Sequence, residues 1–223
     1  MLTIGHRGAK GHVAENTLAS FEKALAFNVD AIELDVHLSS NNEIMVIHDK
    51  TIYRTTTKKG FVKEYTSIEL KELDIPTLEE VFHLINQRCI INIEIKDANA
   101  TQKVIQLIEK FINEYYWNYN LFQISSFNWE VLEEVSHYCY SDKGGISIGV
   151  LTEDTIETAL TFAEKIKAHS INPYFKLLNQ EKVTLIHAKG FKIYTWTVNS
   201  IEDIIFVKSL QVDGIISDFP DRI

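Results

Sequence analysis

Short apolar runs alternate along the chain with longer stretches in which apolar residues recur every three or four positions. The runs have the length of buried strands, and the longer stretches have the periodicity of amphipathic helices. This alternation is typical of β-α-β units, in which helices join parallel strands. The strand-like runs cover residues 2–5, 30–37, 90–95, 121–125, 146–151, 170–174, 192–198 and 214–217.

Start and stop residues mark several of the helices between these runs. Thr77 and Glu80 follow a proline and have the spacing of a capping box. Gly190 is suited to end the helix that precedes it. Further N-cap candidates are Asn16-Thr17, Asn128 and Ser200.

The connection between Asp35 and His48 is too short for a helix. Asn41 and Asn42 lie between its two apolar arms, and asparagine accepts the positive φ of a two-residue hairpin turn. If these two residues form the turn, Asp35 faces His48, with Cβ atoms ~5 Å apart. The sequence therefore predicts a hairpin that returns a histidine to a carboxylate.

Eight strands joined by helices predict an α/β fold, and specifically a TIM (β/α)₈ barrel. An open, doubly wound sheet is the alternative that the pattern alone leaves open. No linker or like-charge block divides the 223 residues, so we expect one domain over residues 1–223. Little chain follows the last run, which predicts a truncated final β-α unit.

The composition excludes several classes of protein. With 45% hydrophobic and 24% charged residues, the chain is neither disordered nor fibrous. A formal charge of −9 disfavours nucleic acid and anionic membrane surfaces as partners. No apolar run approaches the ~20 residues of a membrane span, and the N-terminus lacks signal-peptide features, so we expect a cytoplasmic protein. Cys89 and Cys139 are expected to be reduced and structural.

Three acidic residues are predicted to meet at the carboxyl ends of the strands, where barrel enzymes carry their catalytic groups. Glu33 and Asp35 share one face of the second strand, and Glu94 has a matching position on the third. Buried carboxylates need a compensating charge, because removing each from water costs several kcal/mol. The three oxygen ligands suit Mg²⁺ or Ca²⁺, whereas the absence of cysteine ligands disfavours zinc. An exposed edge pattern is the alternative for Glu33 and Asp35 taken alone.

Eight motifs occur in order along the chain: His6-Arg7-Gly8, Ala14-Glu15-Asn16-Thr17, Glu33-Leu34-Asp35-Val36, His48-Asp49, Asn92-Ile93-Glu94-Ile95-Lys96, Ser125-Ser126-Phe127, Trp196-Thr197-Val198-Asn199 and Asp213-Gly214-Ile215-Ile216-Ser217-Asp218-Phe219-Pro220. Together they resemble the glycerophosphodiester phosphodiesterase family. The resemblance implies a TIM barrel that uses one divalent cation to hydrolyse glycerophosphodiesters to glycerol 3-phosphate and an alcohol.

The resemblance also implies roles for single residues. His6 and His48 match the family's acid and base, a task that suits their near-neutral pKa. Arg7 and Lys96 match the groups that hold the phosphate, and the three carboxylates match the metal ligands. Which histidine is the acid stays open, as does the nucleophile, which is water or the substrate's own 2-hydroxyl. With a divalent cation these charges sum to +1 and without it to −1, which predicts strict metal dependence.

Other residues are expected around this centre. Trp196 is expected to line the glycerol side of the pocket, with plain core packing as the alternative for an aromatic residue on a barrel strand. Phe127 is expected to border the substrate pocket, and Glu15 and Asn16 to brace the loop after His6. Many relatives carry an insertion near residues 73–77, and the short connection here predicts an open leaving-group side that tolerates varied alcohols.

Two rival functions remain at this stage. Hydrolysis of lysophospholipids would need an apolar surface, for which the aromatic cluster at residues 115–119 is the candidate. A non-catalytic phosphate-binding barrel would need no acid–base pair. The role expected is recovery of glycerol 3-phosphate from lipid breakdown, and the sequence leaves the oligomeric state open.

Overall fold

The computed structural model describes residues 1–138 and 145–223, so Cys139 lies outside the described part. Eight parallel strands form a closed ring, since β1 pairs with both β2 and β9. The ring confirms the barrel and excludes the open sheet. Its strands are β1 Leu2–His6, β2 Ala31–Leu38, β4 Ile90–Ile95, β5 Phe122–Ser126, β6 Ser147–Thr152, β7 Ser170–Pro173, β8 Lys192–Thr195 and β9 Gly214–Ser217.

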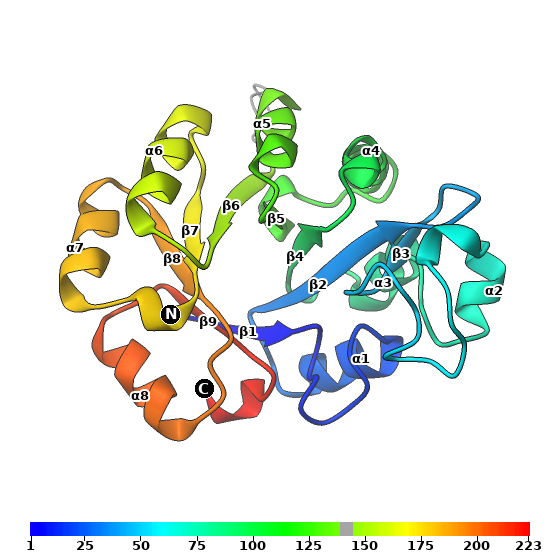
Figure 1. Cartoon of the computed structure of the whole chain (residues 1–223), viewed down its shortest axis with the longest axis horizontal. Helices are drawn as coiled ribbons and strands as arrows, with labels where there is room; N and C mark the ends of the chain where they lie inside the picture. Colours follow the sequence, from blue (N-terminus) through cyan, green and yellow to red (C-terminus); the bar gives the residue numbers. More distant parts are fainter. Residues whose placement is uncertain (139–144) are drawn as a thin grey trace.

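Helices cover the outside of the ring, as Figure 1 shows. Strand residues such as Ile32, Leu34 and Ile93 are fully buried between the ring and this layer. After β9 comes a short 3₁₀ turn, Pro220–Arg222. The helices are α1 Leu18–Ala26, α2 Ser67–Lys71, α3 Leu78–Ile85, α4 Thr101–Glu114, α5 Trp129–Tyr138, α6 Ile156–Ile166, α7 Gln180–Ala188 and α8 Ile201–Ser209.

The predicted helix signals are at the helix ends. Thr77 and Glu80 form a capping box at the start of α3. Thr17 and Ser200 accept hydrogen bonds from the first turns of α1 and α8. Gly190 has a φ of +86° just after α7, a conformation that glycine adopts without strain. Local start and stop chemistry therefore fixes these connections.

The predicted hairpin exists, but the predicted register is wrong by one residue. Strand β3, Ile44–Val46, pairs antiparallel with β2, and Leu38 lies opposite Ile44. Five residues, 39–43, form the connection instead of two, because Ser39 N–H donates to the Glu43 carbonyl and closes a wider loop. Asp35 is consequently paired through its carbonyl with the Ile47 N–H, not with His48.

Residues 47–76, which follow β3, form a lobe beside the barrel mouth. The lobe and β3 share a small core separate from that of the barrel. A bridge between Thr51 and Phe61 folds the first part of the lobe back on itself, and α2 completes it. Figure 1 shows α2 and β3 beyond β2, outside the ring. The core residues are Met45, Ile47, Ile52, Val62, Leu70 and Ile75.

The structure also bears on the expectations for Cys89 and for membrane-spanning helices. Cys89 is buried and free, as a structural cysteine should be. Within the described ranges, no helix has the length and apolarity needed to cross a bilayer.

Candidate active site

The three predicted acidic residues converge at the carboxyl ends of neighbouring strands. Asp35 of β2 lies directly beside Glu94 of β4 in the parallel register, and Glu33 lies two residues earlier on the same face. One oxygen from each carboxylate lies within 4.8 Å of the other two. All three side chains are buried. The cluster therefore has the geometry of a cation site.

The charges around the cluster show why it needs a cation. Burial and the neighbouring carboxylates raise the pKa of Glu33 well above its usual value. Burial and Asp35 raise the pKa of Glu94 to about 7. Burial would also raise the pKa of Asp35, but Lys96 and Arg7 lower it on balance. Buried Asp35 Oδ1 has no hydrogen-bond partner among the described residues. Crowded oxygens with an unsatisfied acceptor fit a divalent cation.

Two cationic side chains flank the carboxylates. Arg7, in a left-handed conformation after β1, donates its backbone N–H to Glu33 and places its Nε 3.3 Å from Asp35. Lys96, just beyond β4, has its Nζ 2.5 Å from Glu94 and 3.4 Å from Asp35. The next residue after Arg7, Gly8, must be glycine, since a Cβ there would lie 2.4 Å from the Ser20 hydroxyl.

His6 and His48 line the same cavity as the carboxylates, and each is held by an aspartate. His6 Nδ1 lies 2.5 Å from Asp218, and His48 Nδ1 lies 2.6 Å from Asp49. An ionised carboxylate can only accept, so each Nδ1 donates and each Nε2 is left to exchange a proton. His6 Nε2 lies 3.9 Å from Glu33.

Burial lowers the pKa of both imidazoles below the usual histidine value, although their aspartate partners oppose the shift. The His6 hydrogen bond helps to bring the pKa of Asp218 down to about 2, against the effect of burial. Neutral imidazoles beside ionised aspartates are suited to accept a proton at Nε2 near neutral pH.

The sequence predictions missed the residues that hold this arrangement. Asp218 and Asp49 belong to the motifs quoted above but had no role assigned, although the adjacency of His48 and Asp49 was a visible signal. Arg54 had no signal at all, since it lies in an irregular part of the lobe. His37, also without an assigned task, donates from Nε2 to the His48 carbonyl at 3.0 Å.

Arg54 contacts two acidic residues with one guanidinium group. Its Nη1 and Nη2 donate to the two Glu15 oxygens at 2.9 and 2.8 Å. Its Nε and Nη2 donate to Asp49 at 2.6 and 3.1 Å. Glu15 in turn accepts from Arg7 at 2.6 Å, while Asn16 donates to Asp35 at 2.9 Å. Glu15 thus contacts Arg7, which follows His6, and Asn16 contacts one of the three clustered carboxylates.

A cavity of about 90 Å³ opens from the carboxylates into the barrel mouth; we call it the inner cavity. Trp196 and Phe127 form one wall, with their rings edge to face at 5.3 Å. Lys96 Nζ lies 5.6 Å from the centre of the Phe127 ring. His6 and His48 both line the cavity.

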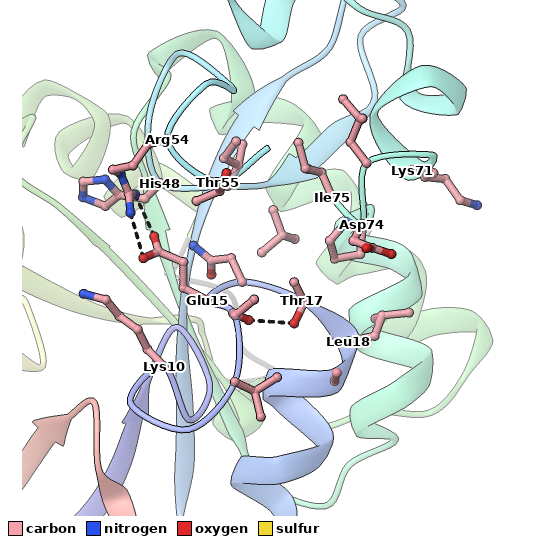
Figure 2. A pocket seen from close by; sticks show the side chains of 18 of the residues that line it. Lys10, Glu15, Thr17, Leu18, His48, Arg54, Thr55, Lys71, Asp74 and Ile75 are labelled. Carbon is pink, nitrogen blue, oxygen red and sulfur yellow. Dashed lines mark hydrogen bonds and ion pairs between the residues drawn. The ribbon is translucent and has the colours of Figure 1, made fainter. Parts of the chain in front are cut away.

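A larger space of about 930 Å³, the outer groove, runs between the loop after β1 and the lobe. Figure 2 shows Arg54, His48 and Glu15 at one end of it and Lys71 and Asp74 at the other. Among the residues described, His48 alone lines both the inner cavity and the outer groove. This histidine therefore stands where the two spaces meet.

The aromatic cluster at residues 115–119 does not extend the site. Trp117 is buried against Phe111 and Phe122, whereas Tyr116 is exposed. These residues lead from α4 into the amino end of β5, opposite the mouth where the carboxylates lie. The cluster provides packing at the base of the barrel and forms no apolar groove at the site.

The fold and this site define a (β/α)₈-barrel enzyme whose mouth can hold a divalent cation and an anionic group. The chain belongs to the glycerophosphoryl diester phosphodiesterase family, whose model matches residues 6–222. It is similar to a glycerophosphodiester phosphodiesterase of Caldanaerobacter subterraneus, with 36% identity over all of this chain and 96% of the relative.

Solved structures of similar proteins have the same fold. A glycerophosphodiester phosphodiesterase from Thermotoga maritima matches with a TM-score of 0.84 and 30% identity, over 99% of this chain and 96% of its own. An Oleispira antarctica phosphodiesterase, solved in complex with the product sn-glycerol-3-phosphate, has a TM-score of 0.87 at 26% identity. That match covers 98% of this chain and 93% of the Oleispira chain.

Proposed function

We propose that this chain, as a single domain over residues 1–223, is a metal-dependent phosphodiesterase that hydrolyses glycerophosphodiesters to sn-glycerol 3-phosphate and an alcohol. The observation that carries the proposal is the buried cluster of Glu33, Asp35 and Glu94 together with two aspartate-held histidines that line the same cavity. Family membership and the product bound to the Oleispira relative support the same substrate class. A pure binding site would need no such pair of histidines.

Glu33, Asp35 and Glu94 would hold Mg²⁺ or Ca²⁺, whose chemistry at this place is to polarise a phosphoryl oxygen. Arg7 and Lys96 bind the phosphate and stabilise the negative charge that develops on its oxygens. The Arg7 guanidinium still has N–H groups to offer once Glu15 has accepted from it. These side chains act as preformed donors because Glu15 and the carboxylates already fix their positions.

The two histidines move the protons. One neutral imidazole takes a proton at Nε2 from the nucleophile, and the other, which must start as imidazolium, gives its Nε2 proton to the leaving alkoxide, while each Nδ1–H stays bonded to its aspartate. Trp196 and Phe127 would pack against the glycerol part of the substrate in the inner cavity. The small size of that cavity suits the glycerol half, which leaves the outer groove for the alcohol.

An assay of the purified protein on glycerophosphocholine and on lysophosphatidylcholine tests this proposal, with release of choline as the readout common to both and glycerol 3-phosphate as the second product expected from glycerophosphocholine. We expect turnover of glycerophosphocholine with Mg²⁺ or Ca²⁺ and loss of nearly all activity after exhaustive chelation, with recovery when the cation returns. Glu94→Gln, which keeps the shape but not the charge, should weaken cation binding measured by calorimetry. Full activity after chelation, or turnover of the lysophospholipid alone, would contradict the proposal.

A further inference from the structure

We propose that Arg54 is a positioning residue that fixes His48 and Arg7 together, so that the lobe of residues 47–76 sets the geometry of both. The inference rests on the proposed function. The hydrogen bonds of Arg54 go to neither residue but to their partners: it acts through Asp49 on His48 and through Glu15 on Arg7.

Arg54, Glu15 and Asp49 form a hydrogen-bonded cluster, which we call the junction. Four hydrogen bonds of 2.6–3.1 Å join one planar guanidinium to both carboxylates. Only arginine has donors arranged to contact two carboxylates in this way. Glu15 is 9% exposed although Arg54 is 40% exposed, so the junction closes over an otherwise buried anion. An ordinary surface ion pair lacks both features and contributes little.

The position of the junction shows what it controls. Glu15 comes from the loop after β1 and Asp49 from the lobe, and both Glu15 and Arg54 line the outer groove. Figure 2 shows the two bonds from Arg54 to Glu15 beside His48. Without Arg54 the Asp49 carboxylate can turn away from His48, and Glu15 keeps only Arg7 as a cationic partner among the described residues. Both the proton-transfer group and the phosphate-binding group would then lose orientation.

The test is the variant Arg54→Ala, compared with Arg54→Lys and with the control Arg88→Ala. Arg88 pairs with Glu22 at 3.3 Å away from the mouth. Because a misplacement of about 1 Å can cost ~10²-fold in rate, we expect kcat/KM to fall by up to that factor in Arg54→Ala. Arg54→Lys, with a point charge in place of the fork, should recover only part of it, and Arg88→Ala should match wild type.

Chemical rescue separates orientation from a general loss of structure. Added guanidinium ion should restore part of the activity of Arg54→Ala, whereas sodium chloride at equal ionic strength should not. In a Glu15→Gln, Asp49→Asn background, removing Arg54 should cost little more, because both partners are already altered. Equal rescue by sodium chloride, or an undiminished loss in that background, would overturn the proposal.

Measurements without turnover keep this inference separate from the proposed function. The His48 Nδ1 proton should give a downfield NMR signal in wild type that weakens in Arg54→Ala, and affinity for glycerol 3-phosphate should fall as Arg7 loosens. Should Arg54→Ala fail to fold, Arg54→Lys decides by the same two signals. An inactive wild-type protein would refute the proposed function only, whereas an unchanged signal and affinity would refute the role of Arg54.

Discussion

The two histidines at the barrel mouth have the same kind of partner but differently built supports. His6 ends β1 and pairs with Asp218, which follows β9 and lies 212 positions away in the sequence. His48 belongs to the lobe and pairs with its own neighbour, Asp49. The His6 side chain is 13% exposed and that of His48 is 31% exposed.

The residues that hold the two aspartates in place also differ. Asp218 accepts from the Asn199 side chain at 2.9 Å and gives its backbone N–H to the same residue, so the adjoining ends of β8 and β9 hold it. Asp49 depends on Arg54, which is anchored on Glu15 across the outer groove. Hydrogen bonds from Asn199 and a longer ion pair with Lys10, at 3.7 Å, therefore hold the partner of His6, whereas short ion pairs across the outer groove hold the partner of His48. Equal chemistry need not mean equal tolerance to mutation.

The largest expected effect comes from removing either imidazole. His6→Ala and His48→Ala should each lower kcat/KM by roughly 10²–10⁴-fold, the usual contribution of general acid–base catalysis. The steady-state rate on glycerophosphocholine measures the loss. His187→Ala is the matched control, since His187 also pairs with an aspartate, Asp213 at 2.8 Å, away from the mouth. Wild-type rates in both site variants would remove the acid–base assignment.

Substitution of the two aspartates should distinguish the His6–Asp218 pair from the His48–Asp49 pair. Asp218→Asn and Asp49→Asn each remove the acceptor that fixes the histidine tautomer, and outer partners of this kind are worth roughly 10- to 100-fold. We expect the larger loss in kcat/KM for Asp218→Asn, because the buried His6 has less room to find another partner. Asp213→Asn is the control. A larger loss for Asp49→Asn would reverse the comparison.

The pH dependence of the unfolding free energy tests how much ionised Asp218 stabilises the fold. Burial raises the pKa of Asp218, but its contact with His6 outweighs this and lowers the pKa to about 2, below the ordinary aspartate value of 3.8. A lowered carboxyl pKa stabilises the fold fully above 3.8, and this contribution is lost as the pH falls from 3.8 to about 2. The difference in unfolding free energy between wild type and Asp218→Asn, measured by urea titration, should shrink over that interval. A constant difference would mean that the ionised form of Asp218 adds no stability.

The sequence predicted the features of this site that depend on local patterns and missed those that depend on contacts between distant residues. Periodicity placed the eight strands, and strand-end chemistry brought Glu33, Asp35 and Glu94 together. The hairpin register failed because the Asn41 side chain accepts from the Ser67 backbone N–H at the start of α2, a contact 26 positions away. A rule for two-residue turns cannot contain that contact.

The sequence also failed to predict the residues that orient the histidines, for the same reason. Arg54 meets Glu15 across 39 positions, and neither lies in a segment with a period that would place it. His48 nevertheless reaches the carboxylates, because the chain continues past the end of β3 toward the mouth. Residue types in a site can thus be predicted from local pattern, whereas the groups that orient them depend on the closed barrel and the folded lobe.

The smallest expected effect concerns the alcohol that leaves. If His48 stands between the two spaces, the glycerol half occupies a cavity of about 90 Å³ and the alcohol extends toward a groove of about 930 Å³. A wide groove discriminates weakly, since even a lost methylene contact is worth only ~1–3 kcal/mol. We expect kcat/KM for the choline, ethanolamine and glycerol diesters to agree within about 10-fold, while lengthening the glycerol half costs more. A sharp preference for one alcohol would show that the lobe closes on the leaving group, and His48 would then be as enclosed during turnover as His6.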